Sequence, residues 1–425
     1  MRWRSPGKCV RHILLAGDVS PNTANIGEIL GIGVDKIFGD VKPLFDAADL
    51  SLVQWETPLA AEPDCAPIPK SGPNLICTPD AAEIMKYLGA DAALLANNHI
   101  GDQGGKAVLE TIRILEEAGV RTVGAGGDLK SARRPLVTDF GMFKLAVINA
   151  AEHEFGTAGR DTPGGAPLDV PEILAQIRAA REDGCRVLVA LHGGHEYDPY
   201  PSPRMVKLFR MFADGGADMV FNCHTHCPEG VEVHNGVPIV FSPGNFYFPL
   251  RNEGKLPLPT WFLGYLAVAG FDEAGAFELE IIPYRFAKER VSLLSGDDKA
   301  RFDEYLATLS RPLADMAELE RLFDLWSIRH GFNYVRGAMK KSSEAGLDFS
   351  DPETVKKFLA FRNTHTCESH CDMIGNFFRL AERGLVPAEP TLAEELADLQ
   401  QGPQLSCPGV SRRQIETKRH CLRRR

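Results

Sequence analysis

Residues 185–194 read CRVLVALHGG, an unbroken apolar run that ends abruptly in polar residues. A short run rich in Val and Leu is typical of a strand that is buried on both faces. Similar runs recur before residue 250, at residues 12–19, 50–56, 92–98, 144–150, 217–226 and 237–245. Amphipathic stretches lie between them, at residues 80–88, 105–118, 171–183 and 203–213. Strands that alternate with helices predict a layered α/β fold.

The sequence changes character after about residue 295. Before that point, residues 263–286 are predicted to form a hairpin that turns at residues 272–275. Residues 299–385 are charged and periodic, which predicts helices, and the last stretch is punctuated by Pro and Gly and then strongly basic. We therefore expect one domain over residues 1–290, a helical extension packed on it over residues 291–400, and a disordered basic tail over residues 401–425.

The composition is that of a soluble globular protein, with 44% hydrophobic and 24% charged residues among 425. The net charge of −10 argues against nucleic acid as a partner, because phosphate contacts need a basic face. No apolar run approaches the roughly 18 residues of a membrane-spanning helix, so we expect no membrane insertion. The N-terminal segment lacks a signal-peptide core. We therefore expect a cytoplasmic protein whose ten cysteines are reduced.

Polar side chains follow the predicted strands at the point where each strand ends. They are Asp18, Glu56, Asn97, Asn98 and His99 with Asp102, then His192, His195 and Glu196, and finally His224 and His226. One such residue alone is usually a turn or a helix cap. Their recurrence at the same topological place favours a shared site, because ligands of open α/β sheets bind outside the carboxyl ends of the strands. Carboxylate, amide and imidazole ligands suit a divalent metal.

The ordered motifs GDV, WETPL, ANNHIGDQG, LHGGHEYDPYPSP and NCHTHCPEGVEVHNGVPIVFSPGNF resemble the CapA-like family, which is named for poly-γ-glutamate capsule synthesis. That family looks like a branch of the calcineurin-like metallophosphatase fold. The resemblance covers residues 12–290 and implies a layered β-sandwich flanked by helices. The segment NTHTCESHCDMI is similar to a C-terminal extension of some members.

The resemblance also implies roles for individual residues. The metal ligands are Asp18, Glu56, Asn98, His192, His224 and His226. His99 matches the general acid or transition-state stabiliser, Asp102 would orient its ring, and His192 and Glu56 belong with the catalytic group. The expected cofactor is a divalent metal, namely Mn, Zn, Fe or Mg.

Three departures from the metallophosphatase pattern leave the number of ions open between two, one and none. Asp18 is followed by Val19 and Ser20, so the usual Asp-x-His pair lacks its imidazole. Glu56 stands where an aspartate usually bridges two ions, and Cys223 precedes the last His-Thr-His in place of glycine.

Two loops are expected to wall a substrate pocket. The loop at residues 150–165 contributes His153, Glu154 and Arg160, and the HGGHEYDPY segment contributes His195, Glu196 and Tyr197. Two cysteine pairs share a four-residue spacing, Cys223 with Cys227 and Cys367 with Cys371. We interpret these thiols as buried packing groups. A zinc cluster of His365, Cys367, His370 and Cys371, and an acid–base role for a thiol beside the site, are the alternatives.

Three functions remain open on the sequence. The first is a metal-dependent hydrolase of a phosphoester or of an amide, such as a γ-glutamyl or peptide bond. The second, which the resemblance to CapA-like proteins also implies, is a metal-independent peptide epimerase in peptide natural-product biosynthesis. It would remove and return a Cα proton with acid–base groups drawn from His99, His192, Asp18, Glu56 and Cys223. The third is a non-catalytic component of polymer synthesis. The corresponding partners are a peptide, polyglutamate or a phosphoester, and the sequence does not indicate an oligomeric state.

Overall fold

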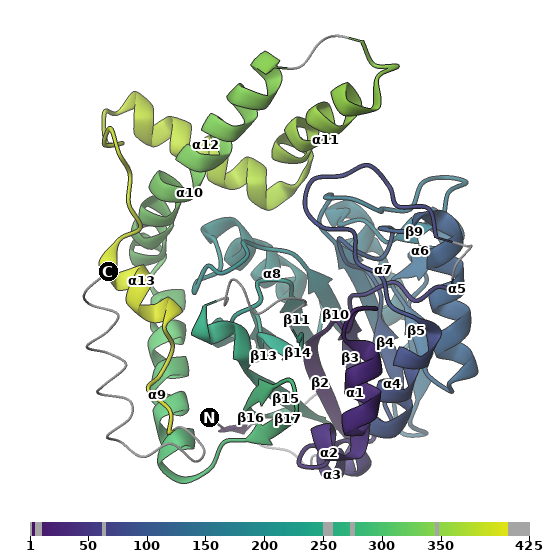
Figure 1. Cartoon of the computed structure of the whole chain (residues 1–425). Coiled ribbons are helices and arrows are strands. Elements are labelled where there is room, and N and C mark those ends of the chain that lie inside the picture. The colour runs from purple at the N-terminus through teal and green to yellow at the C-terminus, as the bar shows by residue number, and fades with distance from the viewer. Residues whose placement is uncertain are drawn as a thin grey trace.

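The computed structural model describes residues 2–4, 11–61, 65–249, 258–272, 277–344 and 348–406. Two β-sheets pack face to face within this part of the chain, and helices flank them (Figure 1). The predicted layered α/β sandwich flanked by helices is thereby confirmed. Among the described residues, no helix combines the length and the apolar character needed to cross a bilayer.

The larger sheet has nine strands, in the order β1-β16-β15-β2-β3-β4-β5, with β14 beside β2 and β17 beside β16. Strands β14, β2, β3, β4 and β5 are parallel neighbours, and the hairpin of β15 and β16 joins β2 antiparallel. The bounds are β1 Arg2–Arg4, β2 Arg11–Val19, β3 Leu50–Trp55, β4 Ala92–Leu94, β5 Arg121–Val123, β14 Asn245–Tyr247, β15 Leu263–Phe271, β16 Phe277–Ala287 and β17 Arg290–Leu293.

The smaller sheet has six strands, in the order β12-β13-β11-β10-β8-β7, and its four central strands are parallel. Their bounds are β7 Leu136–Asp139, β8 Lys144–Ala151, β10 Cys185–His192, β11 Met219–Cys223, β12 Val231–His234 and β13 Val237–Val240. A two-stranded pair, β6 Ala125–Gly126 and β9 Gly164–Gly165, stands apart from both sheets.

Successive side chains of β2 point into two different apolar cores, which explains why the sheets form layers. Ile13 and Leu15 belong to the core between the two sheets, whereas Leu14 and Ala16 belong to the core under the outer helices. Successive side chains of a strand point to opposite faces, so a strand that is apolar at every position is buried on both. The continuous apolar runs in the sequence are these doubly buried strands.

Helices on the larger sheet's outer face are α1 Ile26–Ile32, α2 Val34–Phe38, α3 Lys42–Ala47, α4 Ala82–Leu88 and α5 Gly104–Glu117. The short α6 Leu129–Ala132 lies against β6 and β9, while α7 Val170–Glu182 and α8 Pro203–Asp214 pack on the smaller sheet. The four predicted amphipathic helices correspond to α4, α5, α7 and α8.

Two predicted strands differ from the structure. The run at residues 92–98 keeps only Ala92–Leu94 in the sheet, because the following residues turn away as the loop that carries Asn98. The run at residues 237–245 breaks into β13 and β14, which join different sheets. The predicted hairpin is β15 and β16, and the interior of its turn, residues 273–276, lies outside the described residues.

The helical extension comprises α9 Gly296–Ser310, α10 Met316–Glu344, α11 Pro352–Thr366, α12 Glu368–Glu382 and α13 Glu394–Gln400. Figure 1 shows α10, α11 and α12 over one end of the sandwich. The larger sheet continues past residue 290, because β17 ends at Leu293. Of the predicted tail, residues 401–406 pack on α9, where Ser406 donates to Asp298, and residues 407–425 lie outside the described residues.

Candidate functional site

The carboxyl ends of strands from both sheets converge on one buried group of polar side chains. Asp18 lies one residue before the end of β2, Glu56 follows β3 and Asn98 follows β4 in the larger sheet. His192 ends β10, and His224 and His226 follow β11 in the smaller sheet. All six are buried, with exposed fractions of 6% or less. The two sheets thus deliver the six expected ligand residues to one place.

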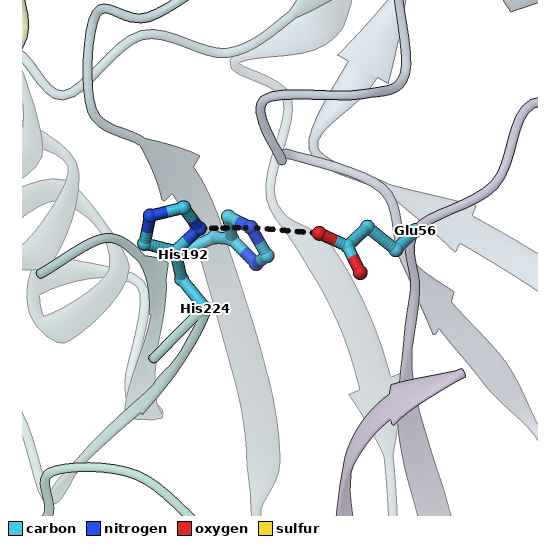
Figure 2. A group of neighbouring side chains, drawn as sticks. All are labelled: Glu56, His192 and His224. Atoms are coloured by element: carbon cyan, nitrogen blue, oxygen red, sulfur yellow. Dashed lines mark hydrogen bonds and ion pairs between the residues drawn. The ribbon is translucent and has the colours of Figure 1, made fainter. Parts of the chain in front are cut away.

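The nitrogen and oxygen atoms of this group face one another at short range. His192 Nε2 lies 3.1 Å from His224 Nδ1, 3.1 Å from Asn98 Oδ1 and 3.7 Å from Glu56 Oε1. Figure 2 shows Glu56, His192 and His224 pointing toward one another from separate segments. Asp18 lies 3.7 Å from His192 Nδ1 through Oδ1, and 3.6 Å from His226 Nδ1 through Oδ2. Glu56 is shared by two such groups, one with His192 and His224 and one with Asp18 and His226.

Backbone strain accumulates at the same place. Four described non-glycine residues have positive φ, and three of them are here: Tyr197 at 67°, His224 at 103° and His226 at 57°. Such conformations are unfavourable for residues with a side chain and persist where the surrounding structure imposes them, often at functional sites. The backbone N–H of His224 donates to Asp18 Oδ2 at 3.2 Å, which ties this strained loop to the end of β2.

The electrostatics of the group fit a cation. Among the described residues, Asp18 Oδ1, both Glu56 carboxylate oxygens and His192 Nδ1 are buried without a hydrogen-bond partner. Burial raises the pKa of Asp18 to about 7, against the opposing effect of His224, and burial together with Asp18 raises the pKa of Glu56 well above its ordinary value. Burial and the neighbouring imidazoles lower the pKa of His192. Unpaired buried carboxylates beside neutral imidazoles are the donor set of a divalent metal site.

His99 lies beside this group, and the charged residues Asp102 and Lys70 hold its ring in place. Its Nδ1–H donates to Asp102 Oδ2 at 2.6 Å, and Lys70 Nζ donates to Asp102 Oδ1 at 2.6 Å. Asp102 is fully buried, and the backbone N–H of Leu75 also donates to it. The arrangement fixes the His99 tautomer with the hydrogen on Nδ1, which leaves Nε2 as its other functional atom. Asp102 therefore lies where the sequence predicts an orienting carboxylate.

Two supporting residues, Lys70 and Asn245, were not predicted from the sequence, and Lys70 lies in a loop with no distinguishing pattern. Glu154 was expected in a loop that walls the pocket and does line it, but its contact with the site, in which Oε2 accepts from Asn98 Nδ2 at 2.6 Å, was not predicted. Asn245 Oδ1 accepts from His226 Nδ1–H at 2.9 Å and so orients that ring. A signal for Asn245 did exist, because it ends an apolar run as the other site residues do.

A cavity of about 540 Å³ opens onto the group, and its lining includes Asn98, His99 and His224. Of the predicted substrate-binding residues, His195, Glu196 and Tyr197 line it. His195 is buried and donates through Nε2 to the carbonyl of Ser369 at 2.8 Å, and burial lowers its pKa to about 3. The cavity's other wall is made by α10, α11 and α12 of the helical extension.

Two predicted substrate-binding residues do not line this cavity. His153 is held by the extension, because its backbone N–H and its Nδ1 both bind the Glu368 carboxylate, at 2.8 Å and 2.6 Å. Arg160 is exposed at a tight turn, which the backbone N–H of Gly159 closes by donating to the carbonyl oxygen and the hydroxyl oxygen of Thr162. Residues 160 and 161 are exposed at this turn, so a binding role for Arg160 stays a prediction that this cavity does not support.

Cys223, Cys227 and Cys367 are buried and do not line this cavity, whereas Cys371 is exposed on α12, contrary to the expectation of a buried thiol. Burial, with Asp18 and Glu56 nearby, raises the pKa of Cys223 well above its ordinary value, which keeps that thiol protonated. Cys227 donates to the carbonyl of Asp198 at 3.2 Å, and Cys367 donates to Glu152 at 3.5 Å. Of the zinc cluster considered as an alternative, Cys367 and His370 lie near each other, but the third potential ligand with them is Glu154.

Comparison with known sequences gives consistent matches. The profile of the bacterial capsule synthesis protein family PGA_cap matches residues 12–250. The PGA biosynthesis protein CapA of Bacillus subtilis (strain 168) is 30% identical over 220 residues, which are 51% of this chain and 57% of that protein. A probable polyglutamine synthesis accessory protein of Mycobacterium tuberculosis is 28% identical over 283 residues, which are 62% of this chain and 73% of that protein. The chain thus matches little more than half the length of the Bacillus relative.

Solved structures with a similar arrangement include a phosphatase of Mycoplasma pneumoniae. It is 12% identical with a TM-score of 0.43, and the match covers 66% of this chain and 95% of that chain. A dimetal phosphatase from Danio rerio is 9% identical with a TM-score of 0.27, over 51% of this chain and 87% of that chain.

Proposed function

The chain belongs to the bacterial capsule synthesis protein family PGA_cap, and from that premise we propose that it is a divalent-metal-dependent hydrolase. The bond that it cleaves is a phosphoester or an amide of the γ-glutamyl or peptide type. The cofactor is one or two ions of Mn, Zn, Fe or Mg. Because relatives are named for PGA and polyglutamine synthesis, glutamate-containing polymers are the first substrates to test.

One observation carries this proposal: three buried carboxylate oxygens, on Asp18 and Glu56, have no hydrogen-bond partner among the described residues. Burying an unpaired carboxylate is strongly unfavourable, and a bound cation removes that penalty. Asp18, Glu56, Asn98, His192, His224 and His226 are the residues that would hold the ion or ions. A divalent metal bound there supplies Lewis acidity and lowers the pKa of water.

The chain's own residues prepare the remaining chemistry. Asp102 and Lys70 fix His99 with its hydrogen on Nδ1, so His99 Nε2 exchanges a proton with the substrate or the leaving group. Asn245 and Glu154 hold His226 and Asn98 in place. The helical extension closes the cavity from the other side and limits access of water.

The test combines metal analysis with activity on defined substrates. Purified protein is stripped with a chelator, reloaded with each candidate ion, and assayed on p-nitrophenyl phosphate, bis-p-nitrophenyl phosphate and γ-glutamyl-p-nitroanilide. We expect hydrolysis that depends on the added ion and is lost in Glu56→Gln, because Glu56 is shared by both ligand groups.

A folded protein that binds no divalent ion would overturn the hydrolase. In that case incorporation of deuterium at Cα of a candidate peptide would support the epimerase. Metal binding without turnover of any of the three substrate types would instead support a non-catalytic role in polymer synthesis.

A further inference from the structure

The junction between α11 and α12 brings a thiol and an imidazole together. Cys367 separates the two helices and is the N-cap of α12, and His370 lies three residues later in the first turn of that helix. Glu154 reaches them from the loop after β8 of the sandwich. One potential ligand atom of each residue lies within 4.8 Å of those of the other two. We call these three residues the junction cluster.

The ring of His370 is oriented as in a metal ligand. Its Nδ1–H donates to the backbone carbonyl of Asn363 at 3.2 Å, which is a common support for a metal-bound histidine. In the neutral ring Nε2 then carries a lone pair, and it lies 3.7 Å from Glu154 Oε1. A lone pair and a carboxylate oxygen that face each other repel, and a cation between them replaces repulsion with attraction. The Tyr334 hydroxyl, 3.1 Å from Nε2, makes the contact that such a cation would displace.

The thiol of Cys367 is available as the third ligand. It is buried and forms no disulfide, and its Sγ donates to Glu152 Oε2 at 3.5 Å, which is a weak hydrogen bond. Arg204 and Ser369 also bind the Glu152 carboxylate. Glu152 therefore stays paired when a metal ion displaces the thiol proton.

The distances and the ligand types favour zinc. Zinc bonds of about 2.0 to 2.3 Å in a tetrahedron place the ligand atoms about 3.3 to 3.8 Å apart. The 3.7 Å between His370 Nε2 and Glu154 Oε1 falls in this range, and Cys367 Sγ reaches it by a shift of about 1 Å or less. The gap of two residues between Cys367 and His370 matches the short gaps between zinc ligands, and a thiolate favours zinc over Mg and Mn.

The cluster joins two parts of the chain. Glu154 belongs to the sandwich and lies in the segment that the family profile matches, whereas Cys367 and His370 belong to the helical extension. Glu154 accepts from Asn98 through its other oxygen, Oε2, so a ligand role for Oε1 leaves that hydrogen bond in place. An ion bound here would therefore hold α12 against the sandwich beside the cavity that Glu154 and His370 line.

We propose that Glu154, Cys367 and His370 bind one zinc ion that fastens the helical extension to the sandwich. Three protein ligands leave a fourth position for water. The six candidate ligands of the proposed function are different residues, so this ion does not depend on the hydrolase. Its role is to keep the extension in place as a wall of the cavity.

Cobalt titration tests for the thiolate ligand. The full-length protein is reduced, stripped with a chelator and titrated with Co²⁺ under anaerobic conditions. A thiolate bound to Co²⁺ gives a charge-transfer band in the near ultraviolet, which oxygen and nitrogen ligands do not give. The six candidate ligands of the proposed function include no cysteine, so the band reports the junction cluster. We expect the band to appear and Zn²⁺ to remove it, and its absence at saturating Co²⁺ would overturn the proposal.

Cysteine variants locate the ion. Cys367→Ser should lose the band, whereas Cys371→Ser should keep it, because Cys371 is exposed on α12 and lies outside the cluster. Cys223→Ser should also keep the band, which excludes the thiol that precedes His224 as its source. A band that survives in Cys367→Ser, or that disappears in either of the other two variants, would overturn the assignment.

A histidine pair gives a second test should Cys367→Ser not fold. His370→Gln keeps the thiol and removes the imidazole, and we expect the band to need at least about tenfold more Co²⁺. His365→Gln is the matched control, because His365 is exposed on α11 and lies outside the cluster. Equal Co²⁺ dependence in the two variants would overturn the role of His370. Glu154 is left unchanged in these proteins because it also holds Asn98.

Thermal unfolding tests the fastening role. An ion that binds only the folded chain raises its unfolding temperature. We expect added Zn²⁺ to raise this temperature more in Cys371→Ser than in Cys367→Ser, and equal rises would overturn the fastening role. None of these measurements reads hydrolysis. A cobalt band without turnover of any substrate would overturn the proposed function alone, and metal-dependent turnover without the band would overturn the zinc site alone.

Discussion

The side-chain amide of Asn98 donates through Nδ2 to Glu154 Oε2 at 2.6 Å, and its Oδ1 lies 3.1 Å from His192 Nε2. Because a carboxylate only accepts, this hydrogen bond decides which end of the Asn98 amide faces the candidate ligands. Glu154 also accepts from Asn363 Nδ2 at 3.1 Å. One carboxylate therefore links the candidate metal site to the helical extension.

Replacement of Glu154 should weaken metal binding at the six candidate ligands without removing any of them. In Glu154→Ala the Asn98 amide is free to rotate, and we expect metal affinity to fall by about 10- to 100-fold. Competition with a chelating dye measures this affinity. Glu182→Ala is the control, since Glu182 is exposed on α7 and does not line the cavity. A Glu154→Ala protein with the affinity of the wild type would show that Asn98 is not held in this way.

Removing the imidazole of one candidate ligand should lower the amount of metal bound per chain. His226→Ala removes a ring whose neighbours are Asp18 and Asn245, whereas His234→Ala removes a ring that pairs with Asp214 outside the site. We expect elemental mass spectrometry to find less metal per chain in His226→Ala and an unchanged content in His234→Ala. Equal metal contents in the two variants would contradict the assignment of His226.

His99 should affect turnover rather than metal content. His99→Gln removes the imidazole that Asp102 holds at 2.6 Å, and loss of a general acid lowers kcat by roughly 10²- to 10⁴-fold. The metal content should stay at the wild-type level, because His99 belongs to neither ligand group. Full activity in His99→Gln would remove it from the mechanism.

The buried carboxylate of Glu152 should make the fold sensitive to acid. Burial by itself would raise its pKa, but Arg204 and Ser369 bring it down to about 2 from an ordinary 4.5. A pKa lower in the folded than in the unfolded chain gives stabilisation that is complete above about pH 4.5 and is lost as pH falls toward 2. Part of the lost stabilisation comes from the docking of the extension, because Ser369 of α12 donates a hydrogen bond to Glu152.

Thermal unfolding between pH 2 and pH 7 measures this effect. We expect Glu152→Gln to be less stable at neutral pH and to lose less stability between pH 4.5 and pH 2 than the wild type. The exposed Glu182→Gln should follow the wild-type curve. A Glu152→Gln profile parallel to the wild type would show that this carboxylate does not contribute to the acid transition.

Close backbone packing beside Asp18 predicts a sharp difference between two glycines. A Cβ at Gly17 would lie 1.9 Å from the carbonyl oxygen of Gly244, so Gly17→Ala must push β14 away from β2. We expect a loss of at least about 2 kcal/mol in unfolding free energy, measured with urea. Gly27→Ala is the control, because a Cβ there meets nothing within 4 Å and lies in α1, where alanine is favoured. Equal effects would contradict the packing.

The sequence predicts those parts of this site that follow from local patterns, and not those that depend on contacts between distant segments. Asp18, Glu56, Asn98, His192, His224 and His226 each follow an apolar run, and period and composition are local properties of a chain. Parallel strands end at the same edge of a sheet, so the runs also indicate that these residues gather. Their roles as ligands stay a prediction until metal is measured.

The supporting residues depend on packing that no local pattern encodes. Glu154 meets Asn363 of α11 across 209 positions, and Lys70 meets Asp102 across 32, although Glu154 and Lys70 lie in segments whose sequences resemble ordinary polar loops. Arg160 was predicted to bind substrate and lies at an exposed turn outside the cavity lining, a position that the hydrogen bonds between Gly159 and Thr162 set and that no local pattern indicated.

The sequence by itself determined the α/β layers, the helical extension and the strand ends that carry the candidate ligands. Only the tertiary structure decided that α10 and α11 of that extension form a wall of the same cavity. The physical reason is that burial periodicity shows which face of a helix is covered but not what covers it. The covering partner is chosen by shape and hydrogen bonding between segments hundreds of residues apart.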